Sequence, residues 1–374
     1  MNPAQPPFES INRLDCQTKL SDWFAHNRRD LPWRESKDPY RIWLSEVLLQ
    51  QTRVDQGLPY FNSFVEQFPT IGDLATASID EVIKAWEGLG YYSRARNLHK
   101  AARLVADQYN GIIPGEYPNL LSLPGVGPYT AAAIASIAFN LPHAVVDGNV
   151  IRVLARLYAF GDEVQSSSSK KWLQEAATYL LDAAHPGDHN ESMMELGALI
   201  CTPKNPSCNS CPLSGDCKAH AASAETDYPV KRVSKPSPHY DIAVGVIKDA
   251  KNRIMVQKRP FDAMLGGLWE FPGGKKDPGE DLETTCIREV LEETGLDVKV
   301  VSQIAQIKHA YSHFKITMHA FECELTAQTD PVTDLEWKWL THEQLAEYAF
   351  PKANRTLIDL LLDEASGTRK AEND

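Results

Sequence analysis

The sequence predicts two domains, an all-helical one followed by a mixed α/β one. At 374 residues the chain is long for a single hydrophobic core, which favours two domains. From about residue 20 to residue 219, amphipathic segments of helical length alternate with short proline and glycine breaks. From residue 241 onward, short β-rich runs replace them. We therefore place a helical domain at 1–219 and an α/β domain at 241–366.

Each domain can be divided into elements. The helical region is broken by proline and glycine at 68–69, 111–118 and 124–128. In the second region we expect strands at 242–248, 254–258, 298–307 and 316–325, with helices at 281–294 and 352–363. The polar, proline-bearing stretch between them predicts a linker at 220–240. The tail at 367–374 is expected to be disordered.

Composition excludes some classes of protein. No run of about 18 apolar residues occurs, so no membrane-spanning helix is expected. The N-terminal segment lacks a basic stretch followed by an apolar one, which excludes a secretory signal and favours the cytoplasm. The formal charge of −12 lowers the expectation of tight nonspecific DNA binding. It does not exclude a DNA partner, because binding needs only a local basic face and backbone amides.

Four of the seven cysteines form a cluster with the spacing C-x6-C-x2-C-x5-C. These are Cys201, Cys208, Cys211 and Cys217. Soft thiolate ligands select zinc or an iron–sulfur cluster, and the spacing alone leaves both open. The single CxxC pair departs from the two pairs usual in zinc ribbons. The remaining cysteines are expected to be free thiols.

A glycine-rich turn precedes a predicted helix. Gly125 and Gly127 permit a tight turn, and Pro128 suits the first position of the helix that follows. Exposed amides at a helix N-terminus can bind a phosphate, although a plain connection between helices fits the same residues. Further along, Asp147 stands before another helix, where it could simply be a cap.

Together these motifs identify a resemblance. LPGVGPYTA (123–131), VDGNVIRV (146–153) and the cysteine spacing resemble the helix-hairpin-helix glycosylase superfamily with its iron–sulfur loop. LPWRESKDPYRIWLSEVLLQQTRV (31–54), WEGLGYYSRARNL (86–98) and MELGALICTPKNPSC (194–208) are similar to MutY-type adenine DNA glycosylases. The resemblance implies an all-helical two-lobed fold, a 4Fe–4S cluster on the four cysteines, and removal of adenine paired with 8-oxoguanine or G in double-stranded DNA. We expect a monomer acting in base excision repair.

The resemblance also implies catalytic roles. Purine release needs a proton on the leaving base and a negative charge near the developing sugar cation. The matching residues are Glu46 and Asp147. Glu46 stands among apolar neighbours, which would raise its pKa, although a solvated outer-face glutamate is the commoner arrangement. Tyr129 occupies the place that holds a Schiff-base lysine in bifunctional relatives, which implies a monofunctional enzyme. Asn149 matches a further active-site position.

Other matched positions concern the DNA. Arg34 and Asn149 match residues that line the adenine pocket. Gln51, Thr52, Leu89 and Tyr91 match residues that probe the base stack and the opposing base. An enzyme that acts on a base in a duplex must flip it out, and Leu89 and Tyr91 would fill the gap.

The C-terminal region contains an intact Nudix box that begins at Gly274. Its glutamates Glu289, Glu292 and Glu293 share one helix face and suit Mg²⁺. LGGLWEFPGGK (265–275) resembles the MutT-like domain of MutY proteins, with Ser312 and His313 in the loop that recognises 8-oxoguanine. Three alternatives remain: a C-terminal domain that also hydrolyses oxidised nucleotides, a DNA-damage-binding protein without catalysis, and a thymine-glycol-type lyase. The presence of both Glu46 and Asp147 argues against the second, and Tyr129 in place of a lysine argues against the third.

Overall fold

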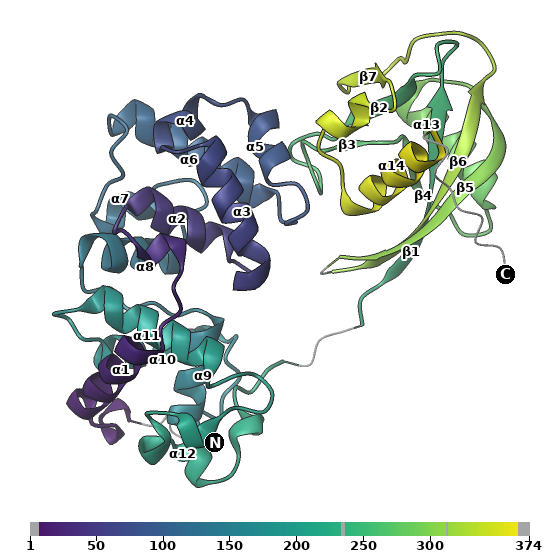
Figure 1. Ribbon diagram of the computed structural model, residues 1–374. Coiled ribbons are helices and arrows are strands. Elements are labelled where there is room, and N and C mark those ends of the chain that lie inside the picture. Colours follow the sequence, from purple (N-terminus) through teal and green to yellow (C-terminus); the bar gives the residue numbers. More distant parts are fainter. Residues whose placement is uncertain (1–6, 233–235, 312, 366–374) are drawn as a thin grey trace. The chain divides into compact units, whose positions relative to one another are not determined.

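The computed structural model describes residues 7–232, 236–311 and 313–365 (Figure 1). Residue contacts divide this part of the chain into two units. One contains the chain up to Thr76 and from Asn97 to the linker, and the other contains Ala77–Arg96 and everything after the linker. Within the described residues, no helix has both the length and the apolar character needed to cross a bilayer.

The first unit is built from helices, as predicted. The helices before the linker, in chain order, are α1 (Arg13–Asn27), α2 (Pro39–Leu48), α3 (Val54–Gln67), α4 (Ile71–Thr76), α5 (Ile79–Ala85), α6 (Ser93–Gln108), α7 (Tyr117–Leu121), α8 (Pro128–Phe139), α9 (Gly148–Leu157), α10 (Ser167–Leu180), α11 (Pro186–Leu199) and α12 (Lys218–Ala221). Of these, α5 and the first turn of α6 group with the second unit. The sequence did not predict that grouping.

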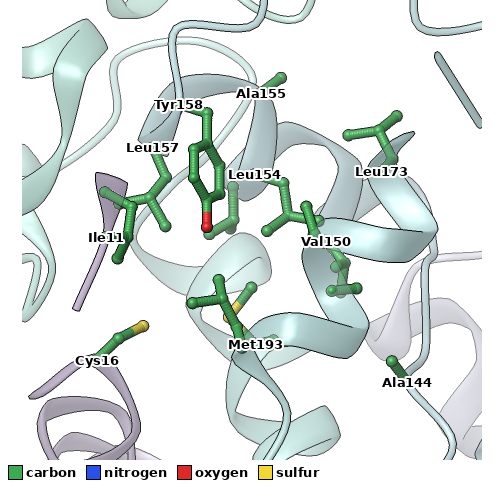
Figure 2. Close-up of a cluster of buried hydrophobic side chains, with 14 of the residues drawn as sticks. Ile11, Cys16, Ala144, Val150, Leu154, Ala155, Leu157, Tyr158, Leu173 and Met193 are labelled. Carbon is green, nitrogen blue, oxygen red and sulfur yellow. The ribbon is translucent and has the colours of Figure 1, made fainter. Parts of the chain in front are cut away.

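One hydrophobic core joins α1, α9, α10 and α11. Figure 2 shows Val150, Leu154 and Met193 of this core pointing toward one another. Leu154 is completely buried, so its replacement by alanine should destabilise the unit by about 2–5 kcal/mol. The core fixes α9 and α11 together, and the candidate site draws residues from both.

A smaller cluster packs α2 against α8. Ala132 and Ala133 present only methyl groups, which lets the two helices approach closely. Helix α2 is buried almost all round, with Trp43 and Leu44 essentially inaccessible. A helix apolar on all sides is typical of a protein interior. The interpretation of Glu46 as a solvated outer-face residue is therefore wrong.

The second unit contains a mixed sheet, confirming the predicted α/β fold. Its elements are β1 (His239–Lys248), β2 (Ile254–Lys258), β3 (Trp269–Glu270), β4 (Gly273–Lys275), α13 (Leu282–Thr294), β5 (Val298–Ala310), β6 (Lys315–Leu325), β7 (Trp337–Leu340) and α14 (Lys352–Ala365). The strand order is β3-β2-β1-β6-β5, with β4 also paired to β1 and β7 to β2. Strands β1 and β6 run parallel, and the other pairs are antiparallel.

Side chains alternate between the two faces of this sheet. Along β1, Ala243 and Ile247 join the core beside α13, whereas Val244 and Val246 join the core beside α14. At Gly245 an added Cβ would lie 2.9 Å from a methyl group of Val290, so glycine allows α13 to approach the sheet closely. This contact holds α13, the helix that carries the Nudix-box glutamates and is called the Nudix helix below, against the sheet.

Candidate active site and DNA-contacting loops

A cavity of about 540 Å³ opens in the helical unit. The predicted residues that line it are Arg34, Glu46, Thr52, Tyr129, Asp147 and Asn149. They come from α2, α8, α9 and two loops, so only the packing of these helices brings them together. Gln51, Gly125 and Gly127 are not among the lining residues.

Glu46 is buried in α2, with 9% of its surface exposed. Burial raises its pKa to about 7, and the negative charges of Asp147 and Glu191 act in the same direction. The hydrogen bond from Tyr129 and the charge of Arg34 oppose this rise. The side chain therefore holds a proton up to about neutral pH and can donate it inside the cavity.

Tyr129 contacts Glu46 directly. Its hydroxyl donates to Oε2 of Glu46 and also approaches the sulfur of Met194 at 3.7 Å. Burial, together with the adjacent Glu46, raises the pKa of the Tyr129 hydroxyl well above its ordinary value. The phenol therefore stays protonated and serves as a hydrogen-bond donor.

Asp147 caps α9 and also faces the cavity, so the two interpretations of this residue are compatible. Its Oδ1 accepts from the backbone N–H of Val150 at 2.7 Å, and its Oδ2 accepts from the Asn149 amide at 2.9 Å. Burial raises the pKa of Asp147, and these hydrogen bonds oppose the rise. Asn149 is held in turn by Arg152, which donates to Oδ1 at 2.8 Å.

The cavity wall also contains charged residues that the sequence did not single out, among them Arg29, Glu191 and Glu195. Glu191 accepts from Nε of Arg34 at 2.7 Å. Burial raises the pKa of Glu191, although Arg34 opposes this. The MELGALIC motif contains Glu195, but the contact of Arg34 with α11 spans 157 residues of sequence and has no local signature.

Two of the predicted DNA-probing residues have unusual backbone conformations. Gln51 has φ of 60° and Tyr91 has φ of 49°, in the left-handed region that non-glycine residues rarely adopt. Such strain costs on the order of 1 kcal/mol and is often found at functional sites. Both side chains have exposed surface.

Leu89 and Tyr91 lie in a tight turn within the second unit. The guanidinium of Arg94 stacks on the Tyr91 ring at 5.5 Å and donates to the carbonyl of Gly90 at 3.2 Å. The turn lines a cavity of about 620 Å³ whose wall also includes His313. Ser312 lies outside the described residues.

The hairpin before α8 has the predicted form. Gly125 has φ of 78°, and an added Cβ would lie 2.6 Å from Cβ of Asn97, so only glycine fits. Gly127 is the N-cap of α8, and a Cβ there would meet nothing within 4 Å. The N-cap makes no side-chain hydrogen bond to the first amides of the helix, which fits an N-terminus that could bind a phosphate.

The cysteine loop is organised by one buried arginine. Arg156 donates to Sγ of Cys201 at 3.3 Å and to the carbonyl of Thr202 at 2.8 Å, and its own carbonyl accepts from Cys217 at 3.4 Å. Burial first, and then nearby negative groups including the other thiols, raise the pKa of Cys208 to about 11 and of Cys211 to about 12. Four thiolates there would need a positive centre, so the residues fit a metal cluster.

Cys208 also faces two side chains that the sequence did not indicate. Its sulfur and the ligand atoms of His220 and Glu225 lie within 4.8 Å of one another. Nδ1 of His220 and Oε1 of Glu225 are 2.5 Å apart. His220 and Glu225 therefore form a hydrogen bond with each other at the edge of the cysteine loop.

The Nudix glutamates have a different environment from Glu46. Arg288 pairs with Glu289 at 2.9 Å and with Glu292 at 3.3 Å. Glu293 accepts from the amide of Gln257 at 2.6 Å and the backbone N–H of Gly273 at 3.0 Å. Glu293 also lies on the wall of a cavity of about 530 Å³ in the second unit.

Comparison with known proteins agrees with this geometry. Residues 44–177 match the family "HhH-GPD superfamily base excision DNA repair protein", and residues 243–360 match the NUDIX domain. The adenine DNA glycosylase of Rattus norvegicus is 34% identical over 405 residues, covering 94% of this chain and 78% of the rat protein. The adenine DNA glycosylase of Buchnera aphidicola subsp. Baizongia pistaciae is 33% identical, covering 79% of this chain and 82% of its own.

A solved structure supports the helical part. A thermostable thymine-DNA glycosylase is 32% identical with a TM-score of 0.52, covering 56% of this chain and 97% of its own. The similarity to the rat protein, in contrast, extends over most of both chains and includes the Nudix region. This chain therefore belongs to the adenine DNA glycosylases, base excision repair enzymes with a helix-hairpin-helix domain and a C-terminal Nudix domain.

Proposed function

We propose that this chain, as a monomer, flips adenine out of duplex DNA where it is paired with 8-oxoguanine or G, and releases it by hydrolysis. The observation that carries the proposal is the pairing of carboxyl groups in the 540 Å³ cavity. Glu46 is buried with a pKa raised to about 7 by that burial. Burial also raises the pKa of Asp147, but the hydrogen bonds that Asp147 accepts from Val150 and Asn149 oppose the rise and favour its charged form. A site with one neutral acid and one carboxylate is suited to cleavage of a glycosidic bond.

In the proposed reaction, Glu46 gives its proton to a ring nitrogen of adenine as the bond from C1′ to N9 breaks. The bonding electrons leave with the base, and positive charge develops on the sugar. Asp147 stabilises that charge and orients a water molecule, whose oxygen bonds to C1′. The products are free adenine and an abasic site, and a proton from the water restores Glu46.

Strand cleavage through a Schiff base is not part of this proposal. Tyr129 has no amine, and it is already engaged with Glu46. Among the described residues that line the cavity, the cations are arginines and none is a lysine. Water therefore remains as the nucleophile.

Recognition of adenine is assigned to Glu191 and Arg34. Oε1 of Glu191 accepts from Arg34, which leaves Oε2 to accept from the exocyclic amine of the base. A base with a carbonyl oxygen at that position would be rejected, because two hydrogen-bond acceptors, that oxygen and Oε2 of Glu191, would face each other. Asn149 and Thr52 line the same cavity and complete its shape.

Recognition of the opposing base is assigned to the second unit. The turn with Leu89 and Tyr91 lines the same 620 Å³ cavity as His313, so wedge residues and the predicted recognition loop share one site. Gln51 would enter the stack from the helical unit, and Ser312 would contact the oxidised base. The amides after Gly125 and at Gly127 would bind a phosphate of the backbone.

We assign a 4Fe–4S cluster to Cys201, Cys208, Cys211 and Cys217. The four cysteines lie in one loop, and the donation from Arg156 to the sulfur of Cys201 would stabilise a thiolate ligand there. When bound, the cluster would fix the loop that follows α11. The chemistry of base release is carried by the carboxyl groups.

The test is single-turnover cleavage of duplexes with A opposite 8-oxoguanine, G or T, with alkali to reveal abasic sites. We expect rapid release opposite 8-oxoguanine, slower release opposite G and none opposite T. Equal rates on the three duplexes would contradict the specificity.

A second candidate function is hydrolysis of oxidised nucleotides by the C-terminal domain. The observation in its favour is the 530 Å³ cavity, where Glu293 stands near the aromatic walls Tyr240, Phe271 and Phe314. A purine could stack there while Mg²⁺, held by Glu289, Glu292 and Glu293, met its phosphates. Incubation of the full-length Glu46→Gln chain with 8-oxo-dGTP and Mg²⁺ tests it. Hydrolysis of the nucleotide to its monophosphate, abolished by Glu293→Gln, would support this function, and no turnover would refute it.

A further inference from the structure

Glu195 occupies the centre of a charge network behind the adenine cavity. It lies on α11 one turn after Glu191 and is 1% exposed. Its oxygens accept from the backbone N–H, Nε and Nη2 of Arg29 at 2.9, 2.9 and 2.8 Å. They also accept from Nη1 and Nη2 of Arg34, each at 3.2 Å.

Such a buried carboxylate is stable only because two cations share it. Burial alone would raise the pKa of Glu195, but the hydrogen bonds from Arg29 and Arg34 lower it to about 2. Glu195 is therefore charged at neutral pH. Among the described residues, Arg29 pairs with Glu195 alone, whereas Arg34 pairs with both Glu195 and Glu191 and so links the two carboxylates.

Four of the five N–H groups of Arg34 donate to acceptors in or beside this network. Its Nε donates to Glu191, and Nη1 donates to the carbonyl of Arg29 and to Glu195. One N–H of Nη2 donates to Glu195. Since a guanidinium has five N–H donors, one N–H of Nη2 lacks a partner within the described chain. The Phe24 ring, 5.4 Å from the guanidinium carbon, limits its movement on one side.

We propose that Glu195 is a positioning residue for adenine recognition: it holds Arg34 in the orientation that fixes Glu191 and leaves one N–H for the base. This inference rests on the proposed function and deepens it. Glu195 does not touch the base. It acts through Arg34, so its contribution should depend on Arg34 being present.

A double-mutant cycle tests this dependence. Glu195→Gln keeps the shape but loses the charge, and single-turnover adenine release should fall about 30-fold, since misplacement of a positioning group costs roughly 10- to 100-fold. In an Arg34→Met background the same change should cost less than about 3-fold, because its target is gone. Additive losses would overturn the proposal.

Base selectivity provides a second readout. We expect Glu195→Gln to reduce the preference for adenine over unsubstituted purine, which lacks the exocyclic amine, by about 10-fold. A purely structural role would lower both rates equally and leave the ratio unchanged. Glu195→Asp, which keeps the charge, should recover most of the rate. Glu175→Gln, on the exposed face of α10, is the matched control and should behave as the unmutated chain.

The controls separate the possible failures. If the unmutated chain releases no adenine, the proposed function fails. If it is active and Glu195→Gln leaves rate and selectivity unchanged, only the role of Glu195 fails. Should Glu195→Gln not fold, the cycle is run with Glu195→Asp. We expect this variant to lower the rate of adenine release about 3-fold in the unmutated chain, and to cause no further loss in the Arg34→Met background.

Discussion

The helical cavity and the Nudix helix both gather glutamates, with opposite electrostatic results. Glu46 is enclosed by apolar helices and contacts a neutral phenol, and burial raises its pKa to about 7. On the Nudix side, Glu280 is partly buried and accepts hydrogen bonds from Arg288, which lower its pKa to about 2. One glutamate keeps its proton up to about neutral pH, and the other is an anion at the same pH. The comparison shows that the environment, and not the residue type, sets the chemistry.

The largest expected effect follows from removing the proton donor. Glu46→Gln keeps the size and the hydrogen bond from Tyr129 but cannot give up a proton. We expect adenine release to fall by at least about 10³-fold, the upper part of the range for general acid catalysis. Binding to a duplex with A opposite 8-oxoguanine, measured by fluorescence anisotropy, should remain. Full activity of this variant would remove Glu46 from the mechanism.

The pH dependence of the unmutated chain tests the environment directly. Glu46 must be protonated to act, and its pKa is raised by burial from 4.5 to about 7. Single-turnover rates should therefore fall as pH rises above about 7, by up to roughly tenfold per unit. A rate that fell instead from pH 4.5 upward would show that Glu46 is solvated.

The same burial predicts an effect on stability. Since folding raises the pKa of Glu46, the folded state is favoured below pH 4.5 and loses this advantage as pH rises through about 7. A shift from 4.5 to about 7 corresponds to roughly 3 kcal/mol. Glu46→Gln should therefore be more stable than the unmutated chain at pH 8 by up to that amount, and equal to it at pH 4. Urea unfolding at both pH values measures this.

The smallest expected effect concerns the Nudix side. Arg288→Met removes the cation that holds Glu280, Glu289 and Glu292, but none of these lines the helical cavity. Adenine release should change by less than about 2-fold, since substitutions away from buried networks have small effects. A loss comparable to that of Glu46→Gln would mean that the two carboxylate clusters do not act separately.

The sequence alone predicted much of the architecture. The predicted strand 254–258 coincides with β2, and the predicted helices at 281–294 and 352–363 correspond to α13 and α14. These elements follow from local periodicity and caps, such as Asp281 before α13 and Gly295 after it. Both the helical fold and the mixed sheet are confirmed. The roles of the site residues stay predictions.

Other features had no local pattern from which to be predicted. Arg29 and Glu195 are 166 positions apart and meet only because α1 and α11 share a core. Ala77–Arg96 groups with the second unit through contacts such as that of Glu87 with Arg355, which are 268 positions apart. The periodicity of apolar residues predicts the secondary structure of one segment, but it does not predict which distant segments that segment contacts.

The sequence by itself determined which groups are present: the acids Glu46 and Asp147, a phenol in place of a lysine, four clustered cysteines, and glycines where the backbone turns. Only the tertiary structure decided what these groups can do. Burial of α2 raises the pKa of Glu46 so that it keeps its proton. The packing of α11 brings Glu195 to Arg29 and Arg34, which donate hydrogen bonds to it at the wall of the cavity. Desolvation and charge pairing act through space, so they depend on neighbours that the folded chain brings together.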